Sequence, residues 1–168
     1  MYREILCDVC DKMKVNYNSK ASTELIELNL LQKILIDAIS KMNSEELKKI
    51  IEELDLKTTD FTKEALIAAL QMGILKGGFL AYQIAVIIAN AVAKAILGRG
   101  LSLTANAAIT RVMGAFAGPI GIALTILWTL VDIAGPAYRV TIPAVVQVAY
   151  IRMKNKEILR LESGQSSK

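Results

Sequence analysis

The sequence predicts an all-α protein, a helical bundle of about seven to eight helices around a hydrophobic central helical hairpin. Apolar residues recur at intervals of three and four positions along most of the chain, which is the spacing of an amphipathic helix. Alternating apolar and polar residues, the pattern of a half-buried strand, are nearly absent. Two long segments, Gly77–Ala93 and Val112–Val131, contain no charged residue and supply the hairpin.

The first 60 residues are expected to form amphipathic acidic helices. Apolar residues lie on one face of a helix over residues 2–13. A second helix is expected over Thr23–Met42, with Ser22 as its N-cap. Asn43 and Glu46 have the spacing of a capping box and therefore start a short third helix.

Residues 61–135 form the predicted hydrophobic hairpin region, where glycine and proline punctuate the helices. The helices expected in this region span residues 61–73, 79–97, 104–116 and 119–134. A C-terminal helix is expected within 136–162, and residues 163–168 have too few apolar groups to fold. We therefore expect one helical domain over residues 1–162, followed by a disordered tail.

Small residues recur every four positions along the charge-free segments. The row consists of Gly77, Ala81, Ala85, Ala89 and Ala93, and Gly114 and Gly118 repeat the spacing. Such a row lets another helix backbone approach closely, a device common in membranes. These residues are predicted to form a helix-packing or membrane face, which also favours a homo-oligomer.

Length and charge leave two interpretations of the apolar segments open. Val112–Val131 is 20 residues long, about 30 Å of helix, and long enough to cross a bilayer. Residues 1–66 carry 10 basic and 13 acidic side chains, a net charge of −3. Residues 67–168 carry 10 basic and 3 acidic side chains, a net charge of +7. A basic, apolar half suggests an anionic membrane surface. Alternatively, the segments are buried helices of a soluble bundle.

Asp132 is the one acidic residue between Glu64 and Glu157. Because an unpaired buried carboxylate is very costly, a buried Asp132 needs a partner or a proton. Arg139 and Arg111 are the candidate partners, and either could form a structural ion pair with Asp132 between helices. Alternatively, the two arginines extend to the membrane surface and contact lipid phosphates.

Several classes of function find no support in the residues. The chain has no histidine, which removes the commonest general base and metal ligand. Cys7 and Cys10 form a lone CxxC inside a helix, without a second ligand pair. We therefore expect no enzyme, no metal site and no cofactor. Scattered basic residues do not predict nucleic-acid binding. The absence of a signal-peptide core in residues 1–20 favours the cytoplasmic side.

The segment Ala137–Arg152, AYRVTIPAVVQVAYIR, resembles the C-terminal signature of the YaaW-like family of bacterial proteins. The start, Tyr2–Lys14, is similar to a mid-chain segment of that family, whose members usually carry a further N-terminal region. The family is uncharacterised and is loosely grouped with ubiquinol–cytochrome c chaperones, which implies an assembly or membrane-proximal role. The signature positions of interest are Tyr138, Arg139, Thr141 and Pro143. Pro143 suits the first turn of the last helix, and Thr141 can cap it.

Taken together, these features predict a non-enzymatic module that associates with or perturbs membranes through its hydrophobic hairpin. Its partner would be membrane lipid, and its location cytoplasmic, peripheral or integral at the inner membrane. The alternative is a soluble assembly chaperone or scaffold that holds an apolar partner helix.

Overall fold

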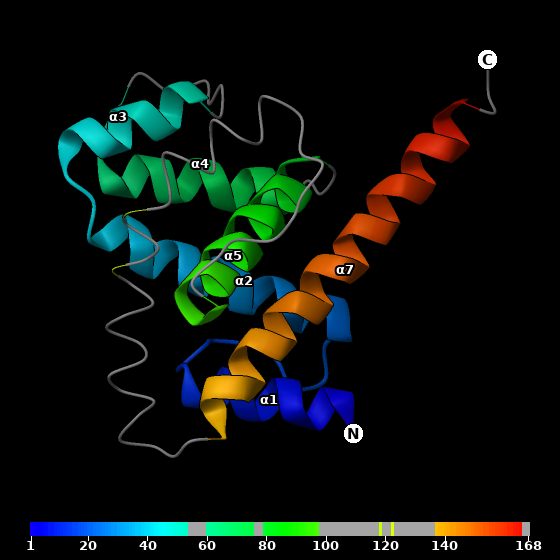
Figure 1. Cartoon of the computed structure of the whole chain (residues 1–168). Coiled ribbons are helices and arrows are strands. Elements are labelled where there is room, and N and C mark those ends of the chain that lie inside the picture. Colours follow the sequence, from blue (N-terminus) through cyan, green and yellow to red (C-terminus); the bar gives the residue numbers. More distant parts are fainter. Residues whose placement is uncertain (54–59, 76–78, 98–117, 119–121, 123–136, 166–168) are drawn as a thin grey trace.

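The computed structural model describes residues 1–53, 60–75, 79–97, 118, 122 and 137–165, and this part of the chain is helical without any strand (Figure 1). Its six helices are α1 Tyr2–Lys12, α2 Thr23–Ser40, α3 Ser44–Glu53, α4 Lys63–Leu75, α5 Phe79–Leu97 and α7 Tyr138–Gln165. The all-α class is confirmed. The predicted count of seven to eight helices and the predicted central hairpin are not confirmed, because most of Val112–Val131 lies outside the described residues.

The predicted helix starts in the N-terminal third are confirmed in detail. The Ser22 hydroxyl accepts a hydrogen bond from the Leu25 backbone N–H at 3.2 Å, as an N-cap does. Asn43 and Glu46 form a reciprocal capping box, with each side chain accepting from the backbone N–H of the other at 2.9 Å. These bonds satisfy backbone donors that would otherwise have no partner in the first turn.

The core is built around α2 and α5. Helix α2 contacts α1, α4, α5 and α7, while α5 has its most extensive contact with α7. Residues 84–89 of α5 are all buried, so this stretch is covered on every side of the helix. The Gln147 side chain of α7 donates to the Ala89 carbonyl of α5 at 3.1 Å. The described partner of the charge-free helix is therefore α7.

Three details of the last helix differ from the sequence prediction. Helix α7 begins at Tyr138, so Thr141 does not cap it; the Thr141 hydroxyl donates instead to the Ala137 carbonyl at 2.8 Å. Pro143 lies inside the helix, beyond its first turn, where it removes one backbone donor. The helix also continues to Gln165, past the expected end at residue 162.

Within the described residues, no helix has both the length and the apolar character that a membrane crossing requires.

Candidate functional site

Helix α7 is the most distinctive element of the fold. Its 28 residues span about 42 Å. Its first half packs against α1, α2 and α5, and its second half runs past the rest of the bundle toward the C-terminus (Figure 1). Between residues 154 and 164, Glu157 alone is buried. We call residues 154–165 the α7 arm.

The face of α7 that points away from the core carries large apolar side chains in contact with water. The exposed ones on this face are Val140, Ile151 and Ile158, between 42% and 72% exposed. Leu161, 55% exposed, lies further along the helix, and Leu159, 64% exposed, borders the groove toward α2. The opposite face supplies Ile142, Val145, Val146, Ala149 and Met153 to the core. A helix that covers one face of a bundle normally presents polar groups outward, so this second apolar face needs a separate explanation.

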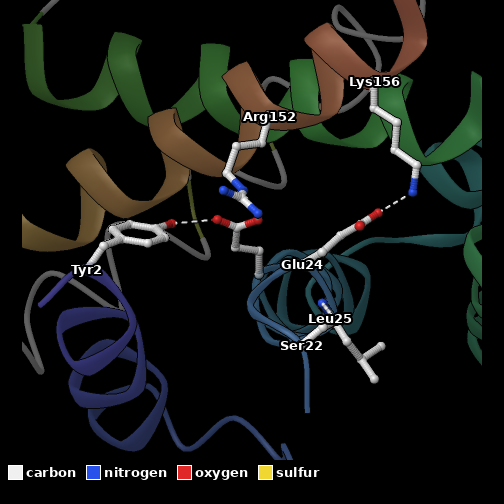
Figure 2. A network of polar contacts seen from close by, with 7 residues as sticks. Tyr2, Ser22, Glu24, Leu25, Arg152 and Lys156 are labelled. Carbon is white, nitrogen blue, oxygen red and sulfur yellow. Dashed lines mark hydrogen bonds and ion pairs between the residues drawn. The ribbon is translucent and has the colours of Figure 1, made fainter. Parts of the chain in front are cut away.

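A buried carboxylate joins three helices at the base of the α7 arm (Figure 2). Glu27 of α2 is 0% exposed. It accepts a hydrogen bond from the Tyr2 hydroxyl of α1 at 2.7 Å and another from Arg152 Nε of α7 at 3.0 Å. Burial of a carboxylate is tolerated only with such partners. Burial, together with the bond to Glu27, raises the pKa of the Tyr2 hydroxyl, so this hydroxyl remains the donor.

Two further contacts hold α7 against the neighbouring helices, one to α2 and one to α1. Lys156 pairs with Glu24 of α2 in an exposed ion pair (Figure 2). At the other end of α1, the Lys12 ammonium lies 5.4 Å from the centre of the Tyr138 ring, within cation–π distance. The arm is therefore anchored at its root, and its outer face points away from these contacts.

The groove between α2 and α7 does not present the chemistry of an anion site. It is lined by Glu24, Glu27, Arg152 and Lys156, with Met153, Asn155 and Leu159 beside them. Each of its two cations already pairs with a carboxylate of α2. These four charges act as a structural joint rather than as a ligand pocket.

The two cysteines differ in their exposure to solvent. Cys10 is buried, and desolvation raises the pKa of its thiol to about 12, so at neutral pH the thiol is protonated and a poor nucleophile. Cys7 is partly exposed. In the described part of the chain, no group of three or more acidic, cysteine or histidine side chains could hold a metal ion.

The predicted site residues are only partly brought together. Asp132, Arg111, Gly77 and Gly114 lie outside the described residues, so the clasp between Asp132 and Arg139 stays a prediction. Of the other signature positions, Tyr138 contacts Lys12, Thr141 bonds within its own helix, and Pro143 lies in α7.

The small-residue row is also divided. Ala85, Ala89 and Ala93 are buried in α5, and the bond from Gln147 brings α7 against the row. Ala81 is half-buried in the same helix. Gly118 is exposed, and a Cβ placed on it would meet nothing within 4 Å, so it shows no close packing against the described part of the chain.

Sequence reasoning missed Glu27, although a signal was present. Glu27 lies three, four and seven residues before Leu30, Leu31 and Ile34, on the face of α2 that enters the core. A carboxylate on the apolar face of a helix indicates a buried polar joint, and it needs a cation from elsewhere. That cation comes from a residue 125 positions away, which no local pattern identifies.

Comparison with known proteins places the chain among bacterial proteins of undescribed role. It is 53% identical over 170 residues to a UPF0174 protein of Helicobacter pylori strain J99, covering 97% of this chain and 67% of the relative. A UPF0174 protein of Helicobacter pylori strain 26695 is 40% identical, over 93% of this chain and 77% of its own length. The UPF0174 protein YaaW of Escherichia coli K12 is 32% identical, over 90% of this chain and 60% of its own length.

No family model matches the chain, and no solved structure is similar to it. The resemblance to YaaW, drawn above from the C-terminal signature, is confirmed by these relatives, whereas their names carry no trace of the chaperone grouping. At 53% and 40% identity over more than nine-tenths of its length, the chain belongs to the UPF0174 family, which includes YaaW of Escherichia coli.

Proposed function

We propose that this protein is a non-enzymatic interaction module, a helical body that presents the outer face of α7 to an apolar protein partner. The observation that carries the proposal is the second apolar face of α7. Val140 is 72% exposed, Ile151 51% and Ile158 42%, although Ile142, Ala149 and Met153 on the opposite side of the same helix are in the core. Exposed apolar patches of this kind mark interaction sites when they are larger than scattered single residues.

The polar joint at the root supports this role. Tyr2, Glu27 and Arg152 hold the arm against α1 and α2 through hydrogen bonds of 2.7 and 3.0 Å. A binding face on a rigid element loses less conformational entropy when a partner binds than a face on a mobile segment does. The joint therefore acts as a support for the arm, without a chemical step of its own.

A photoreactive amino acid in place of Ile158 tests the proposal in cells. We expect a discrete cross-linked product on illumination. The matched control is the same replacement at Met72 of α4, which is 60% exposed and does not belong to the outer face of α7. If position 158 gives no product above the Met72 control, the outer face of α7 has no protein partner and the proposal is wrong.

Membrane association on the cytoplasmic side is the second candidate, through the hydrophobic region over residues 61–135. Its support is the uncharged length of Val112–Val131 within the basic half of the chain. Fractionation with a carbonate wash tests it. Recovery of the protein entirely in the soluble fraction would remove this candidate and leave the interaction module unaffected.

A further inference from the structure

We infer that the partner of the outer face is a second copy of this chain, and that the two α7 helices pair as a parallel coiled coil. This inference rests on the proposed function and names the partner of the same face. Its basis is the spacing of one row on α7, which we call the outer seam. The outer seam consists of Ala144, Val148, Ile151, Asn155, Ile158 and Glu162.

The spacing of the outer seam alternates between four and three residues throughout. That alternation averages 3.5 residues, the repeat with which two helices keep one face against each other. Ile151 and Ile158 occupy equivalent positions one heptad apart and are 51% and 42% exposed. The described part of this chain therefore leaves free two isoleucines that a neighbouring helix could bury.

The position of the seam allows two copies to meet without a clash of their bodies. Ile142, Ala149 and Met153 are buried on the opposite side of α7, against the rest of the bundle. Two copies that meet along the outer seam hence place their bodies on opposite sides of the helix pair. Figure 1 shows the C-terminal end of α7 extending beyond the other described helices, and the exposure of Ile158 and Glu162 leaves the C-terminal half of the seam accessible.

Asn155 decides which class of partner fits. It is exposed and lies between Ile151 and Ile158 along the seam, at the edge where the outer face meets the groove between α2 and α7. In lipid its side-chain amide would have no hydrogen-bond partner, which is costly. Opposite the same residue of a second copy, each amide can donate to the carbonyl oxygen of the other. An asparagine at this kind of position is known to set register and a two-stranded state in coiled coils.

The same residue also sets the direction. In a parallel pair in register, Asn155 faces Asn155 and each isoleucine faces its own copy. In an antiparallel pair that buries both isoleucines, Asn155 would face an isoleucine and lose its partner. The parallel arrangement is therefore the one that satisfies every seam residue except Glu162.

The flanks of the seam carry no like-charged pairs in the parallel register. Lys154 of one copy faces Leu159 of the other, following the usual pairing of positions that border a seam. The preceding flank positions, Gln147 and Arg152, are held within their own chain by bonds to Ala89 and Glu27. Glu162 alone meets its own charge, near the end of the helix. We expect this repulsion to keep the pair weak, and its removal to strengthen the pair several-fold.

Analytical ultracentrifugation of the whole chain over a wide concentration range tests the inference. We expect a monomer–dimer equilibrium in the wild type. A variant with Ile151→Asp and Ile158→Asp should stay monomeric with an unchanged helical spectrum, because both side chains are exposed. Glu162→Leu should lower the dissociation constant several-fold. A wild type that stays monomeric throughout, or a dimer that survives both aspartates, overturns the inference.

Further experiments test whether the two α7 helices are parallel and whether the bound partner is a second copy of the chain. Asn155→Cys should form a disulfide between two copies of residue 155 on mild oxidation, identified by peptide mass; its absence from a dimer that forms overturns the parallel register. In the cross-linking experiment at Ile158, a product with the mass of two chains supports self-association. A product with another protein, from a chain that is monomeric in solution, overturns this inference while the proposed function stands. Binding of monomers to anionic phosphatidylglycerol vesicles, lost in the double aspartate variant, would assign the face to lipid instead.

Discussion

Loss of the Arg152 guanidinium should destabilise the fold far more than loss of a neighbouring surface charge. Arg152→Met keeps an apolar stem on α7 but leaves the Glu27 carboxylate, which is 0% exposed, with the Tyr2 hydroxyl as its remaining side-chain donor among the described residues. A hydrogen bond to a charged group contributes about 1.5–3 kcal/mol, and removal of one partner of a fully buried pair costs about 3–5 kcal/mol. Because Arg152 is itself 51% exposed, we expect a loss near the lower range, about 2 kcal/mol.

The matched control is Lys156→Met, at the same contact between α2 and α7. Its partner Glu24 is 51% exposed and Lys156 is 70% exposed, so the pair should contribute less than about 1 kcal/mol. Urea unfolding followed by circular dichroism, at one low protein concentration, measures both. Adding Glu27→Leu to Arg152→Met should recover stability, since no charge then remains buried. Equal losses for Arg152→Met and Lys156→Met would refute the reasoning that Glu27 is a buried charge held by Arg152.

Three other predictions concern single positions. Ala89→Leu should destabilise the protein by about 1–3 kcal/mol in urea unfolding, because the added carbons meet α7 at the bond from Gln147; an unchanged midpoint would show that the helices do not approach there. Asn43→Ala should lower the free energy of unfolding by about 1 kcal/mol in the same assay, because the capping box is lost. Asn43→Asp should keep most of this stability, because a carboxylate oxygen can accept the same hydrogen bond. The pKa of Cys10 rises from its ordinary value near 9 to about 12 on folding, so its contribution to stability is present below pH 9 and is lost as pH rises toward 12. The stability difference between the wild type and Cys10→Ala should accordingly narrow over this range, and a constant difference would contradict the burial of the thiol.

Local patterns predicted a large share of the fold. The spacing of apolar residues gave the helical class, and the side chains of Ser22, Asn43 and Glu46 marked helix starts that the structure confirms. These features depend on hydrogen bonds within three or four residues, so a short stretch of sequence contains everything needed to infer them. The start of α7 was harder to place, because Pro143 and Thr141 gave a plausible local start that packing against α1 and α5 moved to Tyr138.

The candidate site was beyond reach of local patterns for a different reason. The sequence singled out Asp132 as the acid most in need of a partner, whereas within the described residues the fully buried carboxylate is Glu27. Its burial depends on Tyr2 and Arg152, 25 and 125 residues away. Composition and periodicity alone established that this chain is helical, rich in apolar surface and basic in its second half. Tertiary packing decided which acid is enclosed and which face of α7 stays open, because burial is a property of contacts between helices that are distant in the chain.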